Sequence, residues 1–284
     1  MRKSLRERFA DMTRLYHFTN FDAACKIIES KQLRFGKLSR MNDLIENDKI
    51  VFQRVIFGNL DEDKENGLFA EEEMHRYQQI SFSQDRFVDD KIYEGFNLHP
   101  MWGLYADRGY GVCLVFDKKK LKLADGDYAR DVEYMDYVLP DHAFRNRSKN
   151  GLKAEIWRRR DEIFFCKRKE WGNEQEYRVI RRAKHEYDDE YLDVSDALSF
   201  VILCKDDSLF EGESFKYGFH YMDIKSIDRK LPVLLYKFGL DWYELWRDVP
   251  DDPVWTEMSG FYIWQILVSL LSLLFFNLYY MLSA

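Results

Sequence analysis

The sequence predicts an α+β fold, in which a mixed β-sheet packs against helices. Two continuous apolar runs, Gly111–Phe116 and Phe200–Cys204, are typical of central strands buried on both faces. Segments 15–19 and 131–138 alternate apolar and polar residues, which indicates half-buried strands. Strands and helices do not follow a regular βαβ rhythm, so an α+β arrangement is favoured.

A globular domain is predicted over residues 14–247. Residues 1–13 form a charged lead-in. No apolar segment follows this lead-in, so it is not expected to be a signal peptide. Asn20 is suited to cap a helix at 21–30, which follows the strand 15–19. The other expected elements are a strand at 33–35, a polar loop at 40–46, a helix near 46–57, an acidic loop and helix at 59–76, a strand at 77–83, a polar loop at 84–98, a short helix at 100–106, an amphipathic helix at 151–167, a strand at 174–180 and short elements at 221–246.

Composition narrows the function classes. The 284 residues carry a net charge of −7, so no global basic field attracts the protein to nucleic acid. Each of the four cysteines lies in an apolar run, and none has the spacing of a metal motif. We therefore expect the cysteines to be buried free thiols in a reducing compartment. We do not expect them to form a metal site.

The C-terminal segment 261–284 contains no charged residue. As a helix it would span roughly 36 Å, against about 30 Å of membrane hydrocarbon. Tyr and Trp residues near both ends are typical of interfacial belts. The segment predicts a single-pass tail anchor behind an acidic linker at 248–260, with the bulk of the chain in the cytoplasm; the alternative is a buried C-terminal core helix.

The segment 169–180 carries the strongest chemical signal. Glu174 and Glu176 stand two residues apart at the expected start of a strand. On a strand both carboxylates project to one side, roughly 6 to 7 Å apart. Such a pair is able to stabilise a positive centre or orient a hydroxyl. The alternative is a set of exposed ion pairs with Arg178, which is common and nearly neutral in energy.

Five short blocks follow one another along the chain: Tyr16-His17-Phe18-Thr19, Asn42-Asp43 with Glu46, Ser81-Phe82-Ser83, Met101-Trp102 with Tyr105-Ala106, and Trp171 with Glu174, Glu176 and Arg178. In order and spacing these blocks resemble a bacterial family of unknown function, DUF2971, over about residues 14–240. Leu44 departs from the pattern, because the family tends to have Pro there. That family in turn resembles the ADP-ribosyltransferase fold, and Glu174-Gln175-Glu176 is similar to its E-x-E element.

The resemblance implies an ADP-ribosyltransferase-like mixed sheet with helices, plus the C-terminal transmembrane helix. It implies NAD as the substrate of an ADP-ribosyltransferase or NAD glycohydrolase, in a toxin or phage-defence setting. Cleavage of the nicotinamide–ribose bond builds positive charge on the ribose, as in glycoside hydrolysis. Glu176 is then expected to stabilise that charge through the ribose 2′-hydroxyl, and Glu174 to orient an acceptor, protein or nucleic acid, which the sequence does not identify.

The same resemblance assigns the NAD-binding residues. His17, with Thr19 beside it, is expected to hold the ribose or carboxamide, Ser83 to line the crevice, and Tyr105 or Trp102 to stack on nicotinamide. The proposal requires His17 and Glu176 to line one crevice. For each residue a structural role in the core is the alternative.

Two other functions stay open. One is a non-enzymatic, membrane-tethered module that binds a protein or nucleotide ligand and predicts NAD binding without turnover. The other is a metal-dependent nuclease, which the absence of a Lys after the E-x-E disfavours. The basic runs Lys118–Lys120, Arg158–Arg160 and Arg181–Arg182 would receive a nucleic-acid acceptor if they converged.

Overall fold

The computed structural model describes residues 5–38, 61–136, 148–185, 188–205, 220, 223–237 and 244–248. The predicted loop at 40–46, with Asn42, Asp43 and Glu46, and the predicted helix near 46–57 lie outside these ranges. So do the anchor at 261–284 and all but the first residue of the linker at 248–260. Met1–Trp246 form one unit and Arg247–Ala284 a second, and the elements that position the candidate site belong to the first.

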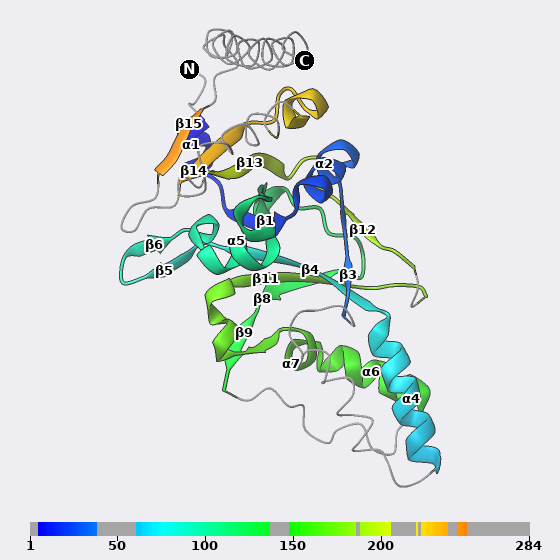
Figure 1. Cartoon of the computed structure of the whole chain (residues 1–284). Helices are drawn as coiled ribbons and strands as arrows, with labels where there is room; N and C mark the ends of the chain where they lie inside the picture. The colour runs from blue at the N-terminus through cyan, green and yellow to red at the C-terminus, as the bar shows by residue number, and fades with distance from the viewer. Residues whose placement is uncertain are drawn as a thin grey trace, which may run out of the picture. The chain divides into compact units, whose positions relative to one another are not determined.

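The described helices and strands alternate irregularly along the chain (Figure 1). The helices are α1 (Leu5–Ala10), α2 (Phe21–Ser30), α4 (Asp61–His75), α5 (His99–Tyr105), α6 (Lys149–Arg158) and α7 (Arg160–Phe164), with short 3-10 helices η2 (Gly95–Asn97), η3 (Asp107–Gly109), η4 (Lys118–Lys120) and η5 (Lys169–Glu174). The strands are β1 (Arg14–Thr19), β2 (Gln32–Arg34), β3 (Gly36–Lys37), β4 (Tyr77–Gln84), β5 (Arg86–Val88), β6 (Lys91–Tyr93), β7 (Val112–Asp117), β8 (Tyr128–Asp131), β9 (Glu133–Met135), β10 (Cys166–Arg168), β11 (Glu176–Arg182), β12 (Tyr191–Asp193), β13 (Leu198–Lys205), β14 (Val233–Lys237) and β15 (Glu244–Asp248).

The main sheet is mixed, with the strand order β15-β14-β13-β7-β1-β4-β11-β8, and β3 pairs with β4. β13 and β14 run parallel, whereas β1, β4, β7, β8, β11 and β13 pair antiparallel with their other neighbours. The predicted apolar strands 111–116 and 200–204 are confirmed as β7 and part of β13, and they lie side by side. Every residue of β7 is buried, as a continuous apolar run predicts.

The two faces of this sheet carry different cores. Residues directly opposite in an antiparallel pair point to the same face, and successive residues alternate. Leu15 packs with Phe82 and the apolar side of α2, so this side is called the Leu15 face. Tyr16 packs with Val115 and Trp102 of α5, so the other side is called the Tyr16 face. A third cluster, on α6 and α7, packs on Ile180, which also belongs to the Tyr16 face by register.

Helix α2 begins and ends where the sequence predicts. The Asn20 side chain accepts a hydrogen bond from the Ala23 N–H at 2.8 Å. Ala24, Ile27 and Ile28 form its buried stripe, and Lys31 ends it in the left-handed region, with φ 55°. The cap satisfies a backbone donor that the first helical turn leaves unpaired.

Replacing Asn20 by Ala is expected to lower the free energy of unfolding by about 1 kcal/mol, because the Ala23 N–H loses its acceptor. Urea denaturation of the full-length protein measures the change. Asn20→Ser is the matched control, since serine restores the acceptor, and its stability should stay close to that of the wild type. An equal loss in both variants would contradict the capping role.

Four sequence-based element predictions are wrong in detail. The helix expected at 151–167 divides into α6 and α7, because Arg159 has φ −96° and ψ 16°, outside helical geometry. The strand expected at 131–138 is the end of β8 and the separate strand β9. The strand expected at 174–180 begins only at Glu176, and the loop expected at 84–98 contains the β5–β6 hairpin.

The predicted fold class needs correction. The fold is α+β with a central mixed sheet, but no helix in the described part of the chain is long and apolar enough to cross a membrane. Segment 261–284 lies outside the described residues, so the membrane contact and cytoplasmic location predicted from it stay predictions.

Candidate functional site

A buried charged centre lies on the Tyr16 face, between the cluster around Trp102 and the cluster around Ile180. Lys167 on β10 donates to Glu174 at 2.6 Å and to Glu176 at 3.4 Å through the same Nζ. All three residues are buried. Each carboxylate is therefore partly compensated by one shared ammonium group, an arrangement that buried charges require.

Glu176 is the fully paired member of this centre. The Arg178 guanidinium donates to its two oxygens from Nε at 2.7 Å and Nη2 at 2.8 Å. The third nitrogen of Arg178 donates to the Phe164 carbonyl. Burial by itself raises the pKa of Glu176, but the charges of Arg178 and Lys167 and the hydrogen bonds from Arg178 and Ser81 lower it to about 2. Glu176 is therefore ionised and locked in place.

Glu174 has a different environment, although it shares Lys167. Its Oε1 accepts a hydrogen bond from the Tyr105 hydroxyl at 2.8 Å. Burial raises the pKa of Glu174, and the neighbouring charge of Glu176 acts in the same direction; Lys167 and the Tyr105 hydrogen bond lower it but do not cancel the rise. Glu174 is therefore the carboxylate of the pair that takes up a proton first as the pH falls.

The backbone separates the two glutamates. Glu174 ends the 3-10 helix η5, and Gln175 turns through the left-handed region at φ 49° before β11 begins at Glu176. The prediction that both project from one strand is wrong for this reason. Lys167 nevertheless joins them, because its Nζ lies 2.6 Å from Glu174 Oε2 and 3.4 Å from Glu176 Oε2.

Half-buried aromatic residues contact the three members of the charged centre. Trp171 on η5 holds its ring 4.9 Å from the Lys167 ammonium, and Tyr105 ends α5. The Tyr134 hydroxyl accepts the Glu176 backbone N–H at 2.9 Å, and burial raises the pKa of Tyr134. Tyr105 thus contacts Glu174, Trp171 contacts Lys167, and Tyr134 supports the start of β11.

The structure does not bring the predicted NAD-binding residues together. Glu176 is opposite Ser83, which is opposite Tyr16, so all three belong to the Tyr16 face. His17 alternates with Tyr16 and lies against the Phe82 ring on the Leu15 face, with its Nδ1 3.2 Å from the Ser81 carbonyl oxygen. The sheet itself therefore separates His17 from Glu176.

The remaining predicted residues divide between the faces. Thr19 shares the Leu15 face with His17, because it is two residues along the same strand. Ser83 lies beside Glu176, and its buried hydroxyl has no hydrogen-bond partner among the described residues. Tyr105 reaches the centre through Glu174. Trp102 is a core residue, with its Nε1 donating to the Phe96 carbonyl at 2.7 Å.

Lys167 is the residue that sequence reasoning missed. It lies within a run of basic residues, Lys167 to Lys169, and spacing alone does not show which member turns inward. The structure buries Lys167, whereas Lys169 pairs with Asp136 at the surface. Within the described ranges, no group of three or more His, Cys, Asp or Glu side chains is placed to hold a metal ion.

Part of the chain matches a known protein family. Residues 101–179 match the family described as "Protein of unknown function (DUF2971)", which confirms the predicted resemblance to that family. The matched segment contains Tyr105, Lys167, Glu174, Glu176 and Arg178. No curated protein and no solved structure matches the chain. The ADP-ribosyltransferase-like part of the predicted fold class is withdrawn, because no such structural neighbour was found.

Proposed function

We propose that this protein, whose residues 101–179 match DUF2971, is an enzyme of glycosyl transfer that acts on the N-glycosidic bond of a nucleotide such as NAD. One observation carries the proposal. Two carboxylates share the Lys167 ammonium, and their surroundings move their pKa values in opposite directions. Pairs of this kind divide the roles of proton carrier and permanent charge in glycosidases.

The geometry gives the reacting role to Glu174. Glu176 has both oxygens occupied by Arg178, so it contributes fixed negative charge and positions Lys167. Glu174 contacts the half-buried Tyr105, and its raised pKa makes it the better base. This assignment reverses the roles that the E-x-E resemblance implied.

The proposed step follows the charge that develops on the sugar. The bond between ribose and nicotinamide breaks, and its electron pair leaves with the nicotinamide, which becomes neutral. The Glu174 carboxylate stabilises the positive charge on the ribose more strongly than it stabilises the ground state. Water or an acceptor hydroxyl then forms the new bond to the sugar, and its proton passes to Glu174.

Nicotinamide release from NAD by the full-length protein is the test, with the product measured by chromatography. Glu174→Gln is expected to lower the rate by about 10²- to 10⁴-fold, since the amide cannot accept the proton. Glu170→Gln is the matched control. Glu170 lies in the same 3-10 helix and pairs with Arg168 at the surface, so this variant should keep the wild-type rate. No NAD turnover by the wild type, or an unchanged rate in Glu174→Gln, would refute the proposal.

A binding module without chemistry is the second candidate. The observation that favours it is the mutual pairing of Lys167, Glu176 and Arg178, which resembles a structural ion network. This candidate predicts that NAD binds at most and that no nicotinamide is released. The same chromatographic experiment therefore separates the two functions.

A further inference from the structure

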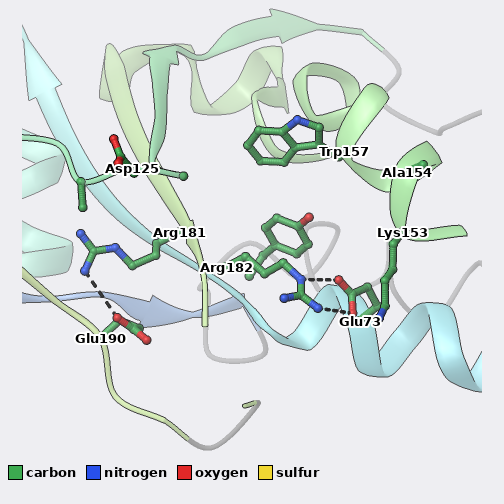
Figure 2. Close-up of a pocket in the computed structure, with 11 residues that line it drawn as sticks. Glu73, Asp125, Lys153, Ala154, Trp157, Arg181, Arg182 and Glu190 are labelled. Carbon is green, nitrogen blue, oxygen red and sulfur yellow. Dashed lines mark hydrogen bonds and ion pairs between the residues drawn. The ribbon is translucent and has the colours of Figure 1, made fainter. Parts of the chain in front are cut away.

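A groove of about 630 Å³ lies where β11 ends, away from the charged centre (Figure 2). Arg182 lines it and is six residues from Glu176 along the strand, or roughly 20 Å. The groove is formed by the end of β11, the turn at 124–126, α4, α6 and Glu190 before β12. Its volume lies in the range of about 300 to 1,000 Å³ that small-molecule sites occupy.

One wall of the groove is an exposed indole. Trp157 on α6 leaves 38% of its surface open to solvent, although it is one of the largest apolar side chains. The Arg160 guanidinium lies 4.8 Å from its ring centroid, and Tyr128 meets it edge-on at 6.1 Å. These contacts hold the indole in place. Figure 2 shows Trp157 between the side of the groove with Asp125 and the side with Lys153.

The arginines of the groove are already neutralised. Arg182 donates to both oxygens of Glu73, with Nη2 at 2.8 Å from Oε2, and Glu73 is buried. Arg181 donates to both oxygens of Asp127 at 2.7 and 2.9 Å, and lies 3.4 Å from Glu190. Arg181 also donates from Nη1 to the Tyr191 carbonyl at 2.8 Å. Both guanidinium groups are therefore held in fixed positions.

Two charged groups in the groove lack such compensation. Lys153 and Asp125 form no ion pair with any other described residue, and they line the groove together with Trp157. The Lys153 ammonium lies 5.6 Å from the Phe69 ring, a contact that leaves its charge unneutralised. The groove thus offers an unpaired cation, an unpaired carboxylate and an exposed aromatic ring within one cavity.

We infer that this groove is a binding site for a nucleoside phosphate, separate from the centre at Glu174. The base stacks on Trp157, because every base has a π-face that an exposed indole accepts. The phosphate binds at Lys153 and Arg182, which supply charged donors. The ribose hydroxyls donate to Asp125, as sugar hydroxyls do to carboxylates in other nucleotide sites. The inference is independent of any chemistry at Glu174.

Isothermal titration calorimetry of the full-length protein with adenosine 5′-monophosphate tests the inference. Binding is expected, and Trp157→Ala should weaken it by about tenfold or more, because the base loses its stacking partner. Trp157→Phe keeps an aromatic face and should lose less. Lys153→Ala should weaken binding of the monophosphate but leave binding of adenosine unchanged.

Lys149→Ala is the matched control for Lys153→Ala. Lys149 is one turn earlier on α6 and lies 5.5 Å from the same Phe69 ring, but it does not line the groove. This variant should bind the monophosphate as the wild type does. Absence of binding to the wild type at millimolar ligand would overturn the inference. So would equal affinities of Trp157→Ala and the wild type, or equal effects of the two lysine variants.

Discussion

Glu176→Gln is expected to lower the free energy of unfolding of the full-length protein by about 3–5 kcal/mol, the usual cost of breaking a buried ion pair from one side. The amide removes the negative charge that holds Arg178 and Lys167 in the interior. Arg178 is only 1% exposed, so its guanidinium has no route to water. Urea denaturation, followed by far-ultraviolet circular dichroism, measures the loss.

Glu174→Gln is the matched control for this prediction. The net effect of its surroundings raises the pKa of Glu174, so the protein already disfavours its charged form relative to the neutral one. A neutral amide keeps a hydrogen-bond acceptor for Tyr105 and should change stability by only about 1 kcal/mol. Equal losses of unfolding free energy in Glu176→Gln and Glu174→Gln would contradict the different roles assigned to the two glutamates.

The pH dependence of the wild type follows from the same pair. The folded-state pKa of Glu176 is lowered to about 2, against an unfolded value of about 4.3. The contribution of Glu176 to the free energy of unfolding is therefore complete above the unfolded-state pKa and is lost as the pH falls toward 2. The raised pKa of Glu174 has the opposite effect on stability. Protonated Glu174 stabilises the folded state, and this stabilisation is lost as the pH rises through its folded-state pKa. Glu176→Gln should flatten the acid side of the stability curve.

Trp102→Ala should destabilise the protein by about 3–5 kcal/mol, in the range for buried aromatic residues. The indole is 1% exposed, meets Phe18 edge-on at 5.2 Å and stacks on Tyr236 at 5.8 Å. Alanine leaves a cavity in this cluster and removes the indole N–H that donates to the Phe96 carbonyl. Thermal and urea unfolding of the full-length protein check the size of the loss.

Tyr105→Phe is the control for Trp102→Ala, because both residues were candidates for stacking on nicotinamide. Tyr105 is half-buried, and its phenylalanine variant keeps the ring but loses the hydrogen bond to Glu174. Its stability should fall by about 1 kcal/mol. If Trp102→Ala and Tyr105→Phe lowered the free energy of unfolding equally, Trp102 would not be the core residue that its burial indicates. A role of Trp102 in ligand binding would then be favoured.

Much of the secondary structure was predictable, because it depends on local patterns. The apolar run at 111–116 became the buried strand β7, and the Asn20 cap began α2 where expected. The prediction of one helix at 151–167 was wrong because the helix is interrupted at Arg159, where nothing in the amphipathic pattern marks the break. The strand expected at Glu174 failed because Gln175 adopts a left-handed conformation, which is uncommon for residues other than glycine.

The candidate site was predictable only in part. The spacing of Glu174 and Glu176 identified two members of the charged centre, and the resemblance to DUF2971 connected them with Tyr105. Lys167 was not identifiable, because it is one lysine among several basic residues. The position of His17 on the sheet face opposite Glu176 was also not predictable from the sequence. It depends on how β1, β4 and β11 align across the sheet.

The sequence by itself determined the α+β character, the central strands, the cap of α2 and the carboxylate pair, because periodicity, capping and spacing act within a few residues. The tertiary structure alone decided which groups meet. Strand register placed His17 and Glu176 on opposite faces, and β10 brought Lys167 between two glutamates. A shift of one residue in register reverses every side chain, so no pattern within a single strand specifies which distant residue lies across from it.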